Sequence, residues 1–190
     1  MSKTALVIYA NGSEALEVTA ITDVLKRTGI SVTTATVNEN EQRSVDLANG
    51  TRVIVDRNLS EVQHETFDVI AIPGGLDGAR NCKDSPVLIE MLKKQQREHR
   101  YNAAICASPG HVLGSHGLVG EARATGYPGC ETGISNYAPS EGVVVDEKHR
   151  LITGKGPAYS LDFAFSIAEV LADPETVARV RQGMLHTERG

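Results

Sequence analysis

The chain has 190 residues, a mass of 20.3 kDa and a formal net charge of -5. This length is typical of one compact domain with a substantial core, so we expect a single domain over residues 1–190. The hydrophobic share of 41% and the charged share of 23% exclude a disordered or fibrous chain. The modest acidic charge provides no basic surface for phosphate backbones, and we expect no nucleic-acid partner.

The N-terminal region and the cysteines indicate the cellular compartment. The apolar run Ala5–Ala10 is shorter than the hydrophobic region of a signal peptide, and it leads into a turn. No stretch approaches the roughly 20 apolar residues that cross a bilayer. Cys82, Cys106 and Cys130 form no CxxC pair or cysteine–histidine cluster, which argues against disulfides and a metal site. The sequence therefore predicts a cytoplasmic protein with reduced thiols, no metal and no membrane partner.

The N-terminal third predicts a β-α-β unit followed by a hairpin arm. The continuous apolar run Ala5–Ala10 is typical of a strand buried on both faces, as in a parallel sheet. From Glu14 to Gly29 the apolar residues recur every three or four positions, which predicts an amphipathic helix ending on a glycine. Ile30–Val37 predicts a second strand. Asn49–Val55 starts with an Asn-Gly turn signal and predicts a short strand or hairpin arm at a sheet edge.

The middle of the chain continues the alternation of strands and helices. Asp68–Ile72 predicts a buried strand that ends at Pro73-Gly74-Gly75. Pro86–Arg97 carries apolar residues at helical spacing and predicts a helix. Tyr101–Cys106 predicts another strand, and Pro109, in a first-turn position, predicts the helix that follows it.

The C-terminal third predicts a loop-rich region, a hairpin and two helices. Residues 123–153 are rich in turn signals and contain two short β-type runs, Gly142–Val145 and Leu151–Thr153, which predict a hairpin. Asp173-Pro174 predicts the start of a terminal helix. Before it, Ser160–Leu171 predicts an amphipathic helix whose buried stripe consists of Leu161, Phe165, Ala168 and Leu171.

These elements define the fold class. Strands that alternate with helices predict a three-layer α/β sandwich with a mainly parallel sheet and helices on both faces. Ligands of such folds bind beyond the carboxyl ends of the strands. Three segments directly follow strands and therefore deserve inspection: Gly12–Glu17, Pro73–Gly75 and Cys106–Gly110.

Cys106 is the strongest candidate for a reactive group. It lies between a predicted strand and a predicted helix, where the positive end of the helix favours a thiolate. Its neighbours Ala104, Ala107 and Ser108 are small, as a sharp strand-to-helix turn requires. From the residues alone, the alternative of a buried core cysteine is more common.

Two further segments carry weaker signals. Gly74 and Gly75 can offer backbone N–H groups to a developing oxyanion, although most Gly-Gly pairs are simple turns. Glu14 and Glu17 are one helical turn apart, so a carboxylate can face the same crevice. Acidic residues in a first turn more often only complement the helix dipole. No glycine-rich nucleotide motif follows any strand, and no nucleotide cofactor is implied.

Four motifs together carry a family resemblance. They are Gly12-Ser13-Glu14-x-x-Glu17, Ile72-Pro73-Gly74-Gly75, Ala103-Ala104-Ile105-Cys106-Ala107-Ser108-Pro109 and Lys155-Gly156-Pro157. With these motifs the chain resembles the ThiJ/PfpI superfamily, closest to the branch that contains the bacterial YajL protein and the human Parkinson-disease deglycase. The similarity extends from about Lys3 to Arg181 without large insertions.

The resemblance implies a flavodoxin-like fold, a homodimer and a site that needs no cofactor. It makes Cys106 the nucleophile on a strained elbow and Glu17 the carboxyl group hydrogen-bonded to its sulfur. Gly74 and Gly75 become the oxyanion-hole amides, with Ala107 beside them in the substrate site. Burial beside the sulfur is expected to raise the pKa of Glu17, so that it can move protons at neutral pH.

The resemblance also implies the chemistry. The branch predicts a glutathione-independent glyoxalase or protein deglycase, a lyase or hydrolase that acts on methylglyoxal, other small 2-oxoaldehydes, or glycated amines and thiols during oxidative and carbonyl stress. The alternative is a redox-sensing, chaperone-like protein whose Cys106 is oxidised to the sulfinate without significant catalysis. A role for Cys130 as a resolving thiol is a further alternative.

Two positions depart from the family pattern, and a third separates the chain from the protease-like branch. Tyr127 stands where many relatives have a histidine, and a phenol with a pKa of about 10 cannot replace an imidazole base at neutral pH. Asn49 stands where a partner subunit often lends an arginine. Ala107 stands where the protease-like branch has a histidine, so peptidase activity is not expected.

Overall fold

The structure is a computed structural model that describes residues 2–187. Its main sheet contains seven strands, which are β1 (Thr4–Tyr9), β2 (Ser31–Thr36), β5 (Arg57–Asn58), β6 (Val69–Ile72), β7 (Tyr101–Ile105), β10 (Val143–Asp146) and β11 (Leu151–Gly154). Their order across the sheet is β10-β11-β7-β6-β1-β2-β5. All neighbouring strands are parallel except β10 and β11, which form an antiparallel hairpin. The predicted α/β class with a mainly parallel sheet is confirmed.

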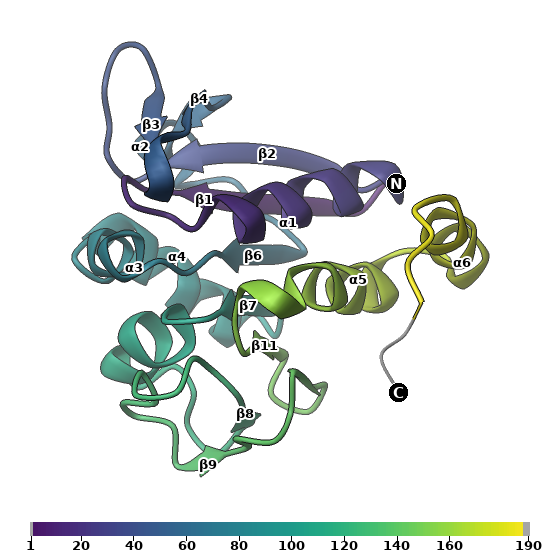
Figure 1. The fold of residues 1–190 in the computed structure, drawn as a ribbon. Coiled ribbons are helices and arrows are strands. Elements are labelled where there is room, and N and C mark those ends of the chain that lie inside the picture. Colours follow the sequence, from purple (N-terminus) through teal and green to yellow (C-terminus); the bar gives the residue numbers. More distant parts are fainter. Residues whose placement is uncertain (1, 188–190) are drawn as a thin grey trace.

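Helices cover both faces of this sheet (Figure 1). The longer ones are α1 (Ala15–Arg27), α3 (Leu76–Lys83), α4 (Pro86–Arg97), α5 (Ser160–Leu171) and α6 (Pro174–Gly183), and the short ones are α2 (Leu59–Val62), η1 (Ala48–Gly50), η2 (Pro109–Leu113), η3 (Gly114–His116) and η4 (Pro157–Tyr159). Apolar residues of α1 and α5 pack on one face of the strands, and those of α2, α3, α4 and η2 pack on the other. Two separate cores result, one on each side of the sheet.

Local sequence signals explain where the main helices begin and end. Helix α1 begins after Glu14, whose Oε2 accepts a hydrogen bond from the Glu17 N–H at 2.9 Å, and the chain leaves it through Gly29 at a φ of 79°. Helix α4 begins after Ser85, which caps it, and α6 begins after Asp173, which accepts from the Thr176 N–H. The predicted ends of α4 and α5 agree with the structure.

Three predictions of local structure need correction. The segment around Asn49–Val55 is a hairpin arm, but its strand β4 (Arg52–Ile54) pairs with β3 (Ser44–Asp46) in a separate two-stranded sheet, not at the edge of the main one. Leu161 was assigned to the buried stripe of α5, yet it is 36% exposed because the helix faces the sheet with Phe163, Ala164 and Ile167 as well as Phe165. Helix α3 had not been predicted.

The loop-rich region after Cys106 contains a second small sheet. Its strands β8 (Arg123–Ala124) and β9 (Asn136–Tyr137) run parallel, and they enclose the turn at residues 125–135. This region lies beyond β7 and β11 and is seen at the bottom of Figure 1. No helix among residues 2–187 is long and apolar enough to cross a bilayer.

Candidate active site

Cys106 directly follows β7 and has a left-handed backbone, with a φ of 65°. This conformation is unfavourable for a residue other than glycine and must be held by its surroundings. The Cys106 N–H donates to the Gly154 carbonyl at 2.9 Å, and the Cys106 carbonyl accepts from the Tyr127 N–H at 2.7 Å. Backbone contacts on two sides therefore fix the turn that places the thiol at the carboxyl edge of the sheet.

Glu17 lies in the first turn of α1 and is fully buried. Its Oε2 accepts a hydrogen bond of 2.6 Å from the Gly74 N–H. Its Oε1 is buried and has no partner of ordinary hydrogen-bond geometry within residues 2–187. Burial raises the pKa of Glu17 to about 7, although the hydrogen bonds from Gly74 and Cys106 oppose this shift. The predicted rise in the pKa of Glu17 is confirmed.

The Cys106 thiol and the Glu17 carboxyl interact as a pair. Burial, together with the charge of an ionised Glu17, raises the pKa of Cys106 to about 12, while the N–H groups of Gly75 and Ala107 act in the opposite direction. The predicted helical segment does follow Cys106, as η2 (Pro109–Leu113) continued by η3 (Gly114–His116). The Ala107 N–H at its start acts to lower the pKa of Cys106, but burial and the charge of Glu17 outweigh it.

The two groups are placed to exchange a proton, which the two pKa values leave mainly on the thiol. When the proton resides on Glu17, the neutral carboxyl group can donate to the sulfur, and the repulsion that raises the pKa of Cys106 disappears. Titrations of such a pair belong to the pair rather than to either residue. The arrangement can therefore supply a thiolate and a carboxylic acid together, without a histidine.

Gly74 marks the point where Cys106 and Glu17 converge. A Cβ at this position would collide with Cβ of Cys106 and lie 2.8 Å from Glu17 Oε2 and 3.0 Å from Cys106 Sγ. The Gly74 N–H is already taken by Glu17, so it is not available to an oxyanion as predicted. The N–H groups of Gly75 and Ala107 contact the sulfur instead and are the donors that remain.

A cavity of about 430 Å³ opens onto the thiol. It is lined by Glu14, Gly75, Leu76, Cys106, Ala107, Tyr127, Pro128, Gly129 and Cys130. The predicted residues Cys106, Gly75 and Ala107 therefore face one space, whereas Glu17 and Gly74 lie behind them. Leu76 was not predicted, although its place directly after the Gly-Gly pair is the signal that would have indicated it.

The two departures from the family pattern lie in different places. Tyr127 lines the cavity and is 48% exposed. Asn49 is exposed on η1, with a φ of 66°, and is not among the residues that line the cavity.

Among the described residues, no cluster of three or more His, Cys, Asp or Glu side chains can hold a metal ion.

The strand order, the strained cysteine after β7 and the buried carboxyl group of α1 define a class of α/β proteins built around one thiol. The model of the DJ-1/PfpI family matches residues 3–170, and the chain belongs to this family.

Individual relatives agree with this assignment. The protein dj-1beta of Drosophila melanogaster is 38% identical over 186 residues, which cover 97% of this chain and 98% of that protein. The crystal structure of Drosophila melanogaster DJ-1beta has a TM-score of 0.93 at 37% identity and covers 99% of this chain and 100% of that one. The glutathione-independent glyoxalase DJR-1.2 of Caenorhabditis elegans is 36% identical over 177 residues, covering 91% of each protein.

Proposed function

We propose that this protein converts methylglyoxal and other small 2-oxoaldehydes, or their early adducts on amines and thiols, by a glutathione-independent reaction at Cys106. The observation that carries the proposal is the carboxyl group of Glu17, which is fully buried beside the Cys106 thiol. Burial raises its pKa to about 7. A carboxyl group with this pKa can both accept and donate a proton at neutral pH. The relative named as a glyoxalase supports the same chemistry.

The reaction follows from the positions of these groups. The thiol proton passes to Glu17 while the sulfur adds to the aldehyde carbon, and the N–H groups of Gly75 and Ala107 receive the developing oxyanion. Glu17 first returns this proton to the oxyanion, which gives the hemithioacetal and frees the carboxylate. The carboxylate then takes the proton from the former aldehyde carbon and delivers it to the neighbouring carbon, while the hydroxyl proton shifts to the neighbouring oxygen, and the product is the thioester of the 2-hydroxy acid. Water cleaves the thioester to give the 2-hydroxy acid and restores the thiol. For an adduct on an amine, the sulfur displaces the amine from the same carbon, and the amine leaves with the proton that Glu17 took from the thiol; the later steps are the same.

Lactate formation from methylglyoxal tests the proposal. We expect Cys106→Ser to lose at least about 100-fold in kcat/KM, because the sulfur forms the covalent intermediate. Cys82→Ala is the matched control, since Cys82 is fully buried and absent from the cavity lining. Equal lactate formation by the parent and Cys106→Ser would contradict the assignment of the nucleophile. Release of free amine from a methylglyoxal–lysine adduct tests the deglycase reaction separately.

A redox-sensing role is the second candidate, in which Cys106 is oxidised to the sulfinate and catalysis is incidental. Its support is the set of donors around the sulfur, namely the N–H groups of Gly75 and Ala107 and a protonated Glu17. These donors can hold sulfinate oxygens. We expect graded peroxide to oxidise Cys106 before Cys82, as measured by peptide mass spectrometry. A parent protein that oxidises at Cys106 but forms no lactate would favour this role over the enzyme.

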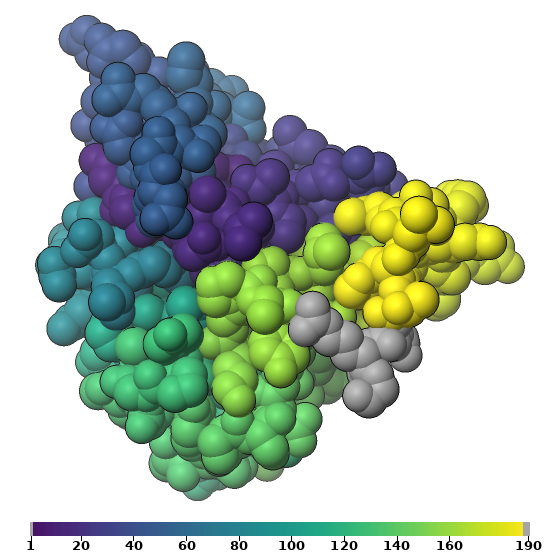
Figure 2. All heavy atoms as spheres, in the orientation of Figure 1, coloured from purple at the N-terminus to yellow at the C-terminus, as the bar shows by residue number. Residues whose placement is uncertain are grey.

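We also propose that the protein is a homodimer. Leu16 of α1 is 65% exposed and Leu161 of α5 is 36% exposed, and both line a hollow of about 830 Å³ between these helices. Figure 2 views this face, where the purple atoms of α1 lie beside the yellow-green atoms of α5. A second copy of the chain would remove this apolar surface from water.

Light scattering checks the dimer. We expect a mass of twice 20.3 kDa for the parent and a shift towards the monomer for Leu16→Asp, because a charge would be buried in the interface. Val145→Asp is the control, since Val145 is 39% exposed on the edge strand β10 and does not line this hollow. A monomeric parent at micromolar concentrations would contradict the proposal.

A further inference from the structure

A second thiol lies in the cavity of Cys106. Cys130 lines the same 430 Å³ space and is 6% exposed, compared with 8% for Cys106. Both are free cysteines. The third cysteine, Cys82, is fully buried in the core between the sheet and α4 and does not reach this cavity. Two of the three cysteines therefore line one cavity.

A tight turn carries Cys130 back to this position. The Tyr127 N–H donates to the Cys106 carbonyl at 2.7 Å, and the Cys130 N–H donates to the Tyr127 carbonyl at 2.9 Å. Pro128 and Gly129 occupy the two central positions of the turn, and Gly129 has the positive φ, 87°, that the second of them requires in a type II turn. Two successive backbone hydrogen bonds thus connect the two cysteines.

The other side of Cys130 is also fixed. A Cβ at Gly110 would collide with the Cys130 carbonyl and lie 2.9 Å from the Thr132 N atom. Gly110 belongs to η2, the segment that follows Cys106 in the chain. The residues around Cys130 therefore pack directly against η2, the segment that follows Cys106. The turn and η2 together hold Cys106 and Cys130 at the cavity.

We propose that Cys130 is the resolving thiol of Cys106 and closes an intramolecular disulfide after peroxide attack. The Cys106 sulfur first attacks peroxide, takes one oxygen as sulfenic acid and releases water. The Cys130 sulfur then attacks the Cys106 sulfur, the S–O bond breaks, and the oxygen leaves as water with the Cys130 proton. The sulfur pair loses two electrons in total, and peroxide accepts both. A small-molecule thiol restores the two cysteines by exchange.

This step shares with the redox role above the requirement that Cys106 is oxidised, but it changes the product. Disulfide closure is intramolecular and independent of peroxide, whereas further oxidation to the sulfinate needs a second peroxide molecule. Low doses of peroxide therefore give the disulfide, and only high doses give the sulfinate. Cys130 thus protects the nucleophile from irreversible oxidation.

Trypsin separates the two cysteines, which makes the test direct. Cleavage after Arg123 leaves Cys106 on the peptide of residues 101–123 and Cys130 on that of residues 124–148. Parent, Cys130→Ser and Cys82→Ala proteins are treated with graded hydrogen peroxide, blocked with an alkylating agent and digested without reductant. Non-reducing electrophoresis distinguishes a bond within one chain from one between two chains.

We expect the linked pair of peptides from the parent and Cys82→Ala at peroxide doses near one equivalent, in chains that migrate as monomers and revert with dithiothreitol. In Cys130→Ser we expect the Cys106 sulfinate at a peroxide dose at least about threefold lower than in the parent. Cys130→Ala serves as a second variant if serine disturbs the fold, which circular dichroism monitors. Sulfinate at Cys106 with the same dose dependence in the parent and both Cys130 variants, and no linked peptides, would overturn the proposal while leaving the redox role intact.

Discussion

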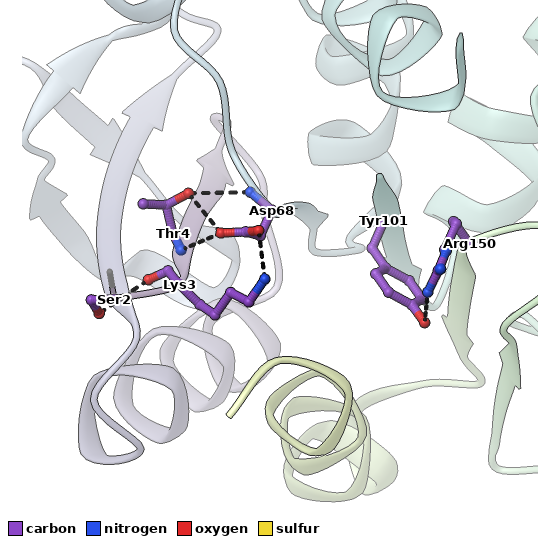
Figure 3. A network of polar contacts seen from close by, with 6 residues as sticks. All are labelled: Ser2, Lys3, Thr4, Asp68, Tyr101 and Arg150. Carbon is purple, nitrogen blue, oxygen red and sulfur yellow. Dashed lines mark hydrogen bonds and ion pairs between the residues drawn. The ribbon is translucent and has the colours of Figure 1, made fainter. Parts of the chain in front are cut away.

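Two carboxyl groups at opposite ends of the central strands have opposite surroundings. Asp68 lies just before β6, and its carboxylate accepts hydrogen bonds from the Thr4 N–H at 2.9 Å, the Thr4 hydroxyl at 3.2 Å and Lys3 Nζ at 3.1 Å (Figure 3). Glu17, at the carboxyl ends of the strands, has one backbone donor on Oε2 and no ordinary partner on Oε1 in the described part of the chain.

The different hydrogen-bond partners of Asp68 and Glu17 move the pKa values of the two carboxyl groups in opposite directions. Burial acts to raise both, but at Asp68 the hydrogen bonds from Thr4 and Lys3 outweigh it and lower the pKa. At Glu17 burial prevails and raises the pKa to about 7. The same figure shows a second contact at the amino-terminal end, where Arg150 Nη1 donates to the Tyr101 hydroxyl at 2.9 Å, although Arg150 Nε is buried without a partner among the described residues. One end of the sheet thus stabilises charge, whereas the other holds a carboxyl group ready to exchange a proton.

The largest effect is expected from closing the space between Cys106 and Glu17. Gly74→Ala places a methyl group against Cys106 Cβ and within 2.8 Å of Glu17 Oε2. A displacement of about 1 Å between reacting groups can cost about 100-fold in rate, so we expect a loss of this order in kcat/KM for methylglyoxal. Gly183→Ala is the control because nothing lies within 4 Å of its Cβ. Full activity of Gly74→Ala would mean that the two side chains need not converge.

The stability of the protein should respond to pH in opposite directions through the two carboxyl groups. The folded pKa of Glu17 is raised, so its contribution to stability is present below its unfolded pKa and is lost as the pH rises through about 7. We expect urea unfolding to show that Glu17→Gln removes about 3 kcal/mol of pH dependence between pH 4.5 and 7.

The folded pKa of Asp68 is lowered, so its contribution is present above its unfolded pKa and is lost as the pH falls through the folded value. Asp68→Asn should therefore destabilise the protein at neutral pH and have little effect in strong acid. If Glu17→Gln and Asp68→Asn changed the pH dependence of the free energy of unfolding in the same direction, the contrast between the two ends of the sheet would be wrong.

Much of the framework follows from local signals in the sequence. Buried strands such as β6 are continuous apolar runs, and helices such as α4 start at a serine cap with proline in the first turn. These signals depend on neighbours within a few residues, so the sequence contains them directly. Cys106 and Glu17 were recognised as a pair only through a family resemblance, because their contact joins segments that are distant in the chain.

The parts that could not be predicted depend on long-range packing. Gly74 was assigned to the oxyanion because glycines permit close approach, but which group takes its N–H is decided by how α1 docks on the sheet. The pKa of Cys106 was expected to fall because a helix was predicted after it; the helical turns η2 and η3 do follow, but the sulfur is buried beside Glu17, and burial and the charge of Glu17 raise the pKa. The cavity position of Cys130 depends on the turn at Tyr127 and its bond to the Cys106 carbonyl.

The smallest effect is expected at Tyr127, and it sharpens the assignment of the proton-transfer group. Tyr127 lines the cavity and is 48% exposed, so water can replace a hydrogen bond made by its hydroxyl. Loss of one hydroxyl at an exposed site costs about 0.5 kcal/mol, so we expect Tyr127→Phe to keep kcat/KM for methylglyoxal within about threefold of the parent. Tyr127→His is the companion variant, because an imidazole titrates near neutrality and would add a second base. If Tyr127→Phe were as inactive as Cys106→Ser, the protons would pass through the phenol, and the buried carboxyl group of Glu17 would then stabilise the site without taking part in the chemistry.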